Sequence, residues 1–197
     1  TRHLMKLAFE HKYQWQNYGL RFNLAFNLSP LSLADSDMVD WLCKLADDHG
    51  IAPSEITFEV TENALLGELA SAIRTLARLR LKGFHIAIDD YGTGFANAQQ
   101  LSRVPATELK IDRSLIHRAA ARPQQLTILT STVELAKNLN LATVAEGVET
   151  EEDFLIVRDL EVDLVQGYYF SKPLFPDDLL AFIKTGLSQI RRQHEAK

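Results

Sequence analysis

The sequence predicts an α/β fold, a TIM-like (β/α) barrel that is incomplete in this chain, with about six of the eight βα units. Three observations lead to this prediction. Short apolar runs alternate with longer amphipathic segments, which is typical of βα units around a parallel sheet. The chain has 197 residues, whereas a closed barrel of eight units usually needs about 250. Finally, polar or charged residues recur at the ends of the predicted strands, as expected where strands meet at a functional mouth.

Six short segments are predicted as strands because they are apolar and rich in β-branched or aromatic residues. They cover residues 22–27, 56–61, 84–88, 108–111, 141–145 and 163–166. An open doubly wound sheet is the alternative architecture for this alternation. A dinucleotide-binding version has little support, because no G-x-G-x-x-G motif follows any of these strands.

The segments between the strands are predicted as helices, several of them with a clear apolar stripe or a recognisable end. They cover residues 2–18, 36–49, 67–82, 124–140, 151–161 and 176–192, with a further short helix after the loop at residues 89–94. Gly19, Gly50 and Gly83 stand where three of them stop, which is the usual place for a glycine past a helix end. No linker or change of composition divides the chain, so residues 1–197 are predicted to form one partial domain.

The polar residues at the strand ends are the main candidates for function. They are Asn27, Glu59, the pair Asp89 and Asp90, Lys110, Glu146 and Gln166. Burying a charge or an amide is costly unless the group is paired or bound to a metal. The carboxyl ends of parallel barrel strands surround one mouth. We therefore interpret this recurrence as convergence on one site rather than as a set of solvated strand ends.

The chemistry of this rim is that of a site for hard cations. Its candidate ligands are carboxylate and amide oxygens beside one lysine, without histidine or thiol. Mg²⁺ and Mn²⁺ prefer such oxygens, and several carboxylates close together would repel one another without a cation. The adjacent Asp89 and Asp90 could serve two metals, and two metals about 3.5–4 Å apart can activate water and stabilise a phosphoryl group. The predicted reaction class is therefore metal-assisted phosphodiester hydrolysis.

Charge and hydropathy argue against several other classes. The net charge is −5 and there is no basic stripe, which argues against binding of duplex nucleic acid. No apolar run reaches the roughly 18 residues of a membrane span, so no membrane contact is predicted. The single cysteine, Cys43, cannot form an internal disulfide, which favours a reducing compartment. The segment from Asp89 to Gly94 fits either an ordinary turn or a mobile loop that couples metal binding to substrate or dimer contacts.

Six motifs resemble those of the EAL domain family, in the family's order and spacing and over nearly the whole chain. They are FNLS at 26–29, FEVTE at 58–62, DDYGTG at 89–94, LKIDRS at 109–114, AEGVET at 145–150 and QGYYFSKP at 166–173. The resemblance implies a bacterial cytoplasmic phosphodiesterase that hydrolyses cyclic di-GMP to linear pGpG with Mg²⁺ or Mn²⁺. A catalytically inactive EAL-like module that binds cyclic di-GMP or a protein partner is the alternative.

The same resemblance implies a role for each matching residue. The implied metal ligands are Asn27, Glu59, Asp89, Asp90 for the second metal, and Glu146. Lys110 resembles the lysine that holds the nucleophilic water, and Glu146 resembles a carboxylate that joins metal binding or water activation. Asp112 and Gln166 resemble residues that line the substrate pocket or that support the residues around it. Glu62 resembles the glutamate that anchors the DDYGTG loop. In the family this loop also contributes to the interface of a homodimer.

The chain departs from the family pattern at its start and in one loop. The Glu-Ala-Leu motif that names the family is absent, so we expect its metal-binding glutamate, a phosphate-contacting arginine and about two strands to lie upstream of Thr1. The 197-residue chain by itself is accordingly expected to hydrolyse cyclic di-GMP far more slowly than an intact domain. In the loop, Ala96 and Asn97 replace small hydroxyl residues, which predicts altered loop dynamics.

Overall fold

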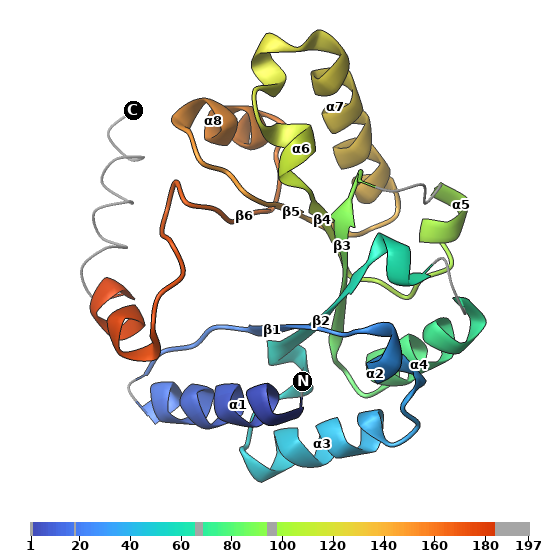
Figure 1. The fold of residues 1–197 in the computed structure, drawn as a ribbon, viewed down its shortest axis with the longest axis vertical. Helices are drawn as coiled ribbons and strands as arrows, with labels where there is room; N and C mark the ends of the chain where they lie inside the picture. The colour runs from blue at the N-terminus through green and yellow to red at the C-terminus, as the bar shows by residue number, and fades with distance from the viewer. Residues whose placement is uncertain (1, 18, 66–68, 94–97, 184–197) are drawn as a thin grey trace.

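The computed structural model describes residues 2–17, 19–65, 69–93 and 98–183, and its centre is a six-stranded parallel sheet (Figure 1). The strands are β1 (Leu24–Asn27), β2 (Ile56–Thr61), β3 (His85–Tyr91), β4 (Glu108–Ile111), β5 (Ala142–Ala145) and β6 (Leu164–Val165). They lie side by side in the order of the sequence, and every neighbouring pair is parallel. Sequential parallel strands joined by helical crossovers form half of a (β/α) barrel, which confirms the predicted fold class.

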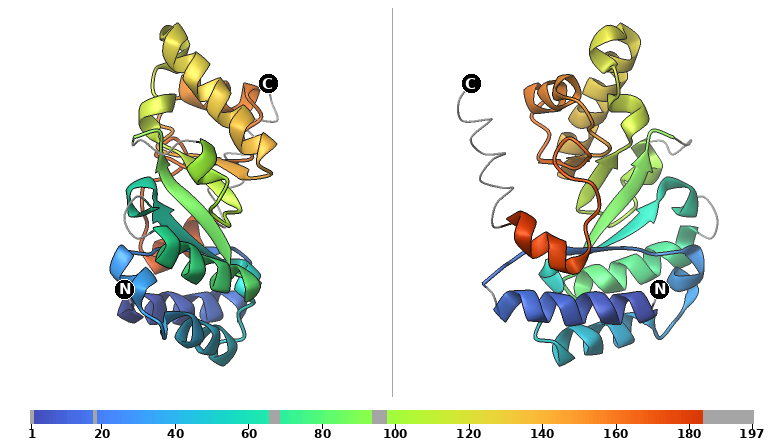
Figure 2. Two further views of the ribbon diagram at one scale, coloured as in Figure 1. Left: turned by 90° about the vertical axis from the view of Figure 1, so that its right-hand side faces the viewer. Right: turned by 60° about the vertical axis from the view of Figure 1, so that its left-hand side comes forward.

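The helices lie on the convex side of the curved sheet (Figures 1 and 2). They are α1 (Arg2–Asn17), α2 (Pro30–Ala34), α3 (Met38–Asp48), α4 (Leu69–Leu81), α5 (Ala98–Leu101), α6 (Arg113–Ile116), α7 (Pro123–Asn138) and α8 (Glu151–Asp159). Three 3₁₀ turns complete the described elements, namely η1 (Pro53–Glu55), η2 (Glu62–Leu65) and η3 (Ala119–Ala121). Residues 176–183 are also helical. Within the described ranges, no helix is long and apolar enough to cross a membrane.

The alternation of side chains along the strands separates a core from a concave face. On β1, Leu24 and Phe26 are half-buried, whereas Ala25 and Asn27 are exposed on the concave side. The ring of Phe26 stacks on Phe9 of α1 at 5.9 Å between centroids and continues to Phe58 of β2 at 6.3 Å. This aromatic row fixes α1 against the sheet and leaves the alternate residues of each strand free to line a site.

Two hydrophobic clusters support the half-barrel. The first lies mainly between β1–β3 and helices α1–α4 and also includes Leu101 of α5 and Ala136 of α7, and the second lies among β4, β5 and helices α6–α8. The strand β4 contributes to both, since Leu109 belongs to the first cluster and Ile111 to the second. Lys110 stands between these two residues in the sequence and points to the opposite, concave face.

The predicted strands are present, and the main differences are at their ends. The strand β3 continues to Tyr91, beyond the predicted end at residue 88, and β6 is shorter than predicted. The short helices α2 and α6 were not predicted. Each begins at a side chain that caps it, Ser29 for α2 and Asp112 for α6. The last predicted helix is described only to residue 183, and Gly94, Ala96 and Asn97 lie outside the described residues.

The short strand β6 is tied to β5 by a side-chain clip. The Oδ2 atom of Asp163 accepts hydrogen bonds from the backbone N and from Oγ1 of Thr143, both at 2.8 Å. Asp163 N in turn donates to Thr143 Oγ1 at 3.0 Å. The backbone hydrogen bond from Thr143 is the main reason why the pKa of Asp163 lies below its ordinary value. The clip thus sets the register in which the chain approaches Gln166.

We expect Asp163→Asn to lower the melting temperature at pH 7, because the neutral amide oxygen accepts the two hydrogen bonds from Thr143 more weakly than the charged carboxylate does. A depressed folded-state pKa stabilises the fold above the unfolded pKa of an aspartate, about 3.9, and this stabilisation is lost as the pH falls through the folded value. The gap between the variant and the unmutated protein should therefore narrow as the pH falls below the unfolded value and through the lowered folded one. Thermal unfolding from pH 2 to 7 measures it, with the exposed Asp47→Asn as control. A gap that persists at pH 2 would contradict the role of the charge.

Candidate active site and metal centre

Lys110 on β4 is the centre of the candidate site, with a side chain that is 7% exposed. Its Nζ lies 2.7 Å from Oε1 of Glu59 on β2 and 2.9 Å from Oδ1 of Asp89 on β3. It also lies 2.8 Å from Oε1 of Glu146, the residue that follows β5. The structure therefore brings together four of the residues predicted from the strand ends, each from a different strand.

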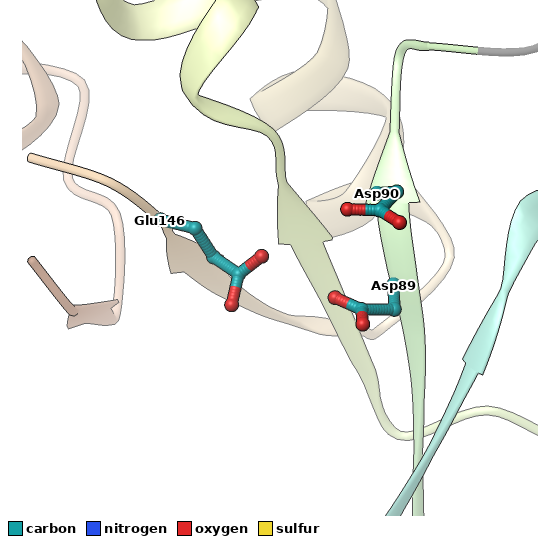
Figure 3. Close-up of side chains that lie close together, drawn as sticks. All are labelled: Asp89, Asp90 and Glu146. Carbon is teal, nitrogen blue, oxygen red and sulfur yellow. The ribbon is translucent and has the colours of Figure 1, made fainter. Parts of the chain in front are cut away.

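Asp89, Asp90 and Glu146 form a carboxylate group that could hold a metal ion. Each offers one oxygen, and these oxygens all lie within 4.8 Å of one another. Figure 3 shows the carboxylates of Asp89 and Glu146 turned toward one another, with Asp90 next to Asp89 at the end of β3. Oxygen ligands at such separations suit Mg²⁺ or Mn²⁺, which take carboxylate oxygens.

A local break in β3 places Asp89 and Asp90 at the same mouth. Successive residues of a regular strand point to opposite faces. Here the register between β3 and β4 shifts between Ile88 and Tyr91, and Asp90 adopts a left-handed conformation with φ of 56°. Aspartate tolerates this conformation better than most residues. The bulge turns the second carboxylate back toward the first, and two adjacent acidic residues can then serve one site.

The charges of the site are arranged around Lys110. Burial acts to lower the pKa of Lys110, but hydrogen bonds with Glu146, Glu59 and Asp89 outweigh it and raise the pKa above its ordinary value. The amine is therefore charged throughout the neutral range. Burial raises the pKa of Glu146, and the negative charges of Asp89 and Glu59 add to this effect against the opposing influence of Lys110. Burial likewise raises the pKa of Asp90, with the charge of Asp89 as the next cause. Because several carboxylates surround a single lysine, the site keeps an excess of negative charge, and a divalent cation would offset it.

Glu62 lies just after β2 and is almost fully buried, with an exposed fraction of 2%. Its Oε2 accepts a hydrogen bond from the backbone N of Gly92 at 3.4 Å. Gly92 has φ of 104°, a conformation that favours glycine. Glu62 therefore contacts the turn that follows Asp90, as the anchoring role predicted for it requires.

Asn27 and Gln166 lie at the ends of the two outer strands, Asn27 as the last residue of β1 and Gln166 directly after β6. Asn27 ends β1 and stands beside Glu59 in the ladder. The backbone N of Gln166 donates to Ala145 O at 2.8 Å, and its backbone O accepts from Val148 N at 3.1 Å, so its two bonds flank Glu146 in the sequence. Gln166 also lines an open hollow of about 300 Å³ on the concave face. Its lining residues are Asn23, Leu24, Ala25, Thr57, Glu59, Glu108, Lys110, Val144, Leu164, Val165 and Gln166.

Asp112 differs from the other predicted residues because its side chain caps a helix. Its Oδ1 accepts a hydrogen bond from Ser114 N at 2.8 Å and thereby caps α6. Its charge still contributes to the raised pKa of Asp90. In the structure, the carboxylate of Asp112 supports the helix beside the site, and any contact with a substrate would come in addition to this bond.

Three features of the site were not selected from the sequence. Glu108 reaches into the hollow and accepts from Thr57 Oγ1 at 3.3 Å. An ion pair at 2.7 Å joins Arg113 to Glu149 beside the mouth. Gly147, next to Glu146, has φ of 63° and touches α6. The signal that could have revealed Gly147 is a glycine directly after a strand-end carboxylate, where the chain must turn sharply.

Comparison with known proteins identifies close relatives of the chain. The family model for the EAL domain matches residues 1–173. The cyclic di-GMP phosphodiesterase RocR of Pseudomonas aeruginosa is 33% identical over 156 residues, which are 79% of this chain and 40% of RocR. The bifunctional diguanylate cyclase/cyclic di-GMP phosphodiesterase MucR of the same species is 36% identical over 162 residues, which are 82% of this chain and 24% of MucR. The chain thus spans less than half the length of these curated relatives.

Solved structures show the same fold. The PaMucR phosphodiesterase in complex with c-di-GMP matches with a TM-score of 0.82 and 34% identity, over 88% of this chain and 71% of that one. The EAL domain of Mycobacterium smegmatis DcpA matches with a TM-score of 0.86 and 29% identity, over 92% and 82%. A manganese and cy-diGMP complex of Klebsiella pneumoniae BlrP1 at pH 9.0 matches with a TM-score of 0.79 and 30% identity, over 88% and 44%.

Proposed function

The chain belongs to the EAL domain family, and from this premise we propose that it carries most of the metal and water site of a cyclic di-GMP phosphodiesterase. The observation that carries the proposal is the contact of Lys110 Nζ with carboxylates from three other strands. A lysine held among acids at the mouth of a half-barrel fits a site for an anionic phosphodiester and divalent cations. The reaction proposed is hydrolysis of one phosphodiester bond of the ring, which yields linear pGpG.

The donor set fits Mg²⁺ or Mn²⁺ in a two-metal site. The proposed ligands are Asn27, Glu59, Asp89, Asp90 and Glu146. The cluster of Asp89, Asp90 and Glu146 supports this assignment, because its oxygens lie close together and carry an uncompensated charge. Bound divalent cations lower the pKa of water and stabilise negative charge on phosphoryl oxygens. The relative in complex with manganese, BlrP1, supports the same choice of metal.

The residues of the chain have distinct proposed roles in the attack by water. Lys110 stays charged. Its three N–H donors face Glu59, Asp89 and Glu146, so one of these contacts would open as cations bind the carboxylates, and the freed donor would hold the water by a hydrogen bond. Glu146 has a raised pKa and accepts a proton from that water as the oxygen–phosphorus bond forms. The bond from phosphorus to the leaving ribose oxygen then breaks, this oxygen takes up a proton from solvent, and Glu146 returns the proton that it accepted to solvent. Gln166, at the edge of the hollow, and Asp112 are the proposed substrate contacts.

Glu62 and the turn after Asp90 provide a proposed link between the site and a second copy of the protein. The hydrogen bond between Glu62 and Gly92 holds the first part of the DDYGTG segment next to the carboxylates. We propose that residues 89–94 contribute to a homodimer interface, so that association and metal binding affect one another. Gly94 itself lies outside the described residues.

The test is a hydrolysis assay with the intact parent protein, Mg²⁺ or Mn²⁺, and cyclic di-GMP, in which chromatography separates cyclic substrate from linear product. We expect pGpG to form and EDTA to stop its formation. Absence of product at any enzyme concentration would defeat the proposal. Binding of cyclic di-GMP by calorimetry without loss of the ring would instead identify an inactive binding module.

A further inference from the structure

The short helix α6 (Arg113–Ile116) lies against both turns that carry the candidate metal ligands. A Cβ atom built on Gly92, after Asp90, would lie 2.5 Å from Cδ1 of Leu115. A Cβ atom built on Gly147, after Glu146, would lie 2.7 Å from Cβ of Arg113. Real Cβ atoms do not approach so closely, so each turn packs its backbone directly on a side chain of α6. One four-residue helix therefore fills the space between the two turns.

Backbone and charge contacts hold α6 in this place. Before the helix, Asp112 N donates to Tyr91 O at 3.3 Å on the side of β3. On the side of β5, Glu146 N donates to Ile111 O at 3.0 Å. The cap by Asp112 fixes the start of the helix. The ion pair between Arg113 and Glu149 links the helix to the segment that follows Gly147. The helix is therefore tied to both turns and cannot shift toward one without pulling on the other.

We propose that Leu115 and Arg113 are positioning residues that set the separation between Asp90 and Glu146, and with it the spacing of the two metal ions. This inference rests on the proposed function. A two-metal site requires ions about 3.5–4 Å apart, and a close-packed contact resists changes of a fraction of an ångström. Leu115 is 9% exposed, and it packs in the second hydrophobic cluster as well as against Gly92. In this proposal each residue acts through a glycine turn and not as a ligand of the ions.

Mn²⁺ binding to Leu115→Ala, made in the same intact parent protein as in the hydrolysis assay, tests the inference without use of the catalytic reaction. Calorimetry gives the affinity and number of bound ions, and electron paramagnetic resonance reports the magnetic coupling between two neighbouring Mn²⁺ ions. With the support under Gly92 removed, we expect one of the two ions to bind at least about tenfold more weakly, as for other groups that orient metal ligands. The coupling between the ions should weaken or vanish, while circular dichroism stays that of a folded protein.

Leu129→Ala is the matched control, because Leu129 on α7 is fully buried in the same hydrophobic cluster as Leu115. This substitution should leave both Mn²⁺ affinities within about twofold of those of the unmutated protein, because Leu129 does not lie against Gly92 or Gly147. Equal loss in both variants would overturn the inference, because general loosening of the cluster would then explain the result. Should Leu115→Ala unfold, Leu115→Val removes less of the contact and is measured in its place.

The outcomes separate this inference from the function on which it rests. If the unmutated protein binds no Mn²⁺, the proposed metal site is wrong and the positioning role falls with it. If the unmutated protein binds two coupled ions and a folded Leu115→Ala or Leu115→Val protein binds them unchanged, only the positioning role is overturned.

Discussion

Replacing Lys110 by Met is expected to make the protein unstable in EDTA and to make its stability strongly dependent on Mn²⁺. The amine contacts Glu59, Asp89 and Glu146 within 2.9 Å, and its removal leaves three partly buried carboxylates without a cation. Breaking a buried ion pair from one side costs about 3–5 kcal/mol. A bound divalent ion would take over part of the charge compensation, and its binding free energy adds to the stability of the folded state. Thermal unfolding in EDTA and in millimolar Mn²⁺ measures both effects.

The control for this variant is Lys44→Met, since Lys44 forms an exposed ion pair with Asp48 within helix α3. Exposed pairs of this kind contribute only about 0.3–0.5 kcal/mol, so its melting temperature should change little and should not depend on Mn²⁺ more than that of the unmutated protein. A Lys110→Met protein as stable in EDTA as the unmutated one would mean that the three carboxylates do not need the lysine.

Asp89→Asn is expected to abolish hydrolysis of cyclic di-GMP by the intact parent protein while the fold survives. Asp89 lies in the group of close carboxylates and also contacts Lys110. The amide keeps the shape of the side chain but removes one negative charge from the proposed metal site. We expect a fall in rate of at least about 100-fold, the upper end of the effect seen for groups that only support a ligand. Product formation and Mn²⁺ affinity are the two measurements.

Asp48→Asn, a change of the same kind on the exposed surface of α3, should leave both the rate and the Mn²⁺ affinity unchanged. Hydrolysis that survives in Asp89→Asn would show that the carboxylate pair is not the metal site. A loss of rate without a loss of Mn²⁺ affinity would place Asp89 in the chemistry through its contact with Lys110 alone, and would contradict its assignment as a ligand.

The fold and the core of the site could be predicted because they follow from periodic signals. Alternation of apolar runs defines the strands, and parallel strands must bring their carboxyl ends together. Glu59, Asp89, Lys110 and Glu146 met in the structure for this reason. Whether the outer residues Asn27 and Gln166 take part in binding remains a prediction.

Local geometry limited what the sequence could reveal. The bulge that brings Asp90 to the mouth depends on one left-handed residue and a shift of register, which no hydrophobic pattern encodes. The helix α6 has four residues, and its cap at Asp112 resembles any turn with an aspartate. The contacts of Gly92 and Gly147 with this helix join segments far apart in the chain. Such features arise from tertiary packing, which a single sequence does not display.

The position of β4 between the two hydrophobic clusters has a consequence for the stability of the candidate site. Leu109 anchors one side of the molecule and Ile111 the other, while Lys110 joins acids that belong to both sides. The residues of the candidate site therefore lie across the boundary between the two hydrophobic clusters. A fluctuation that separates the two clusters would break the contacts of Lys110 before the core of either cluster is exposed to solvent. A ligand bound at the site would contact residues on both sides and would therefore oppose this separation.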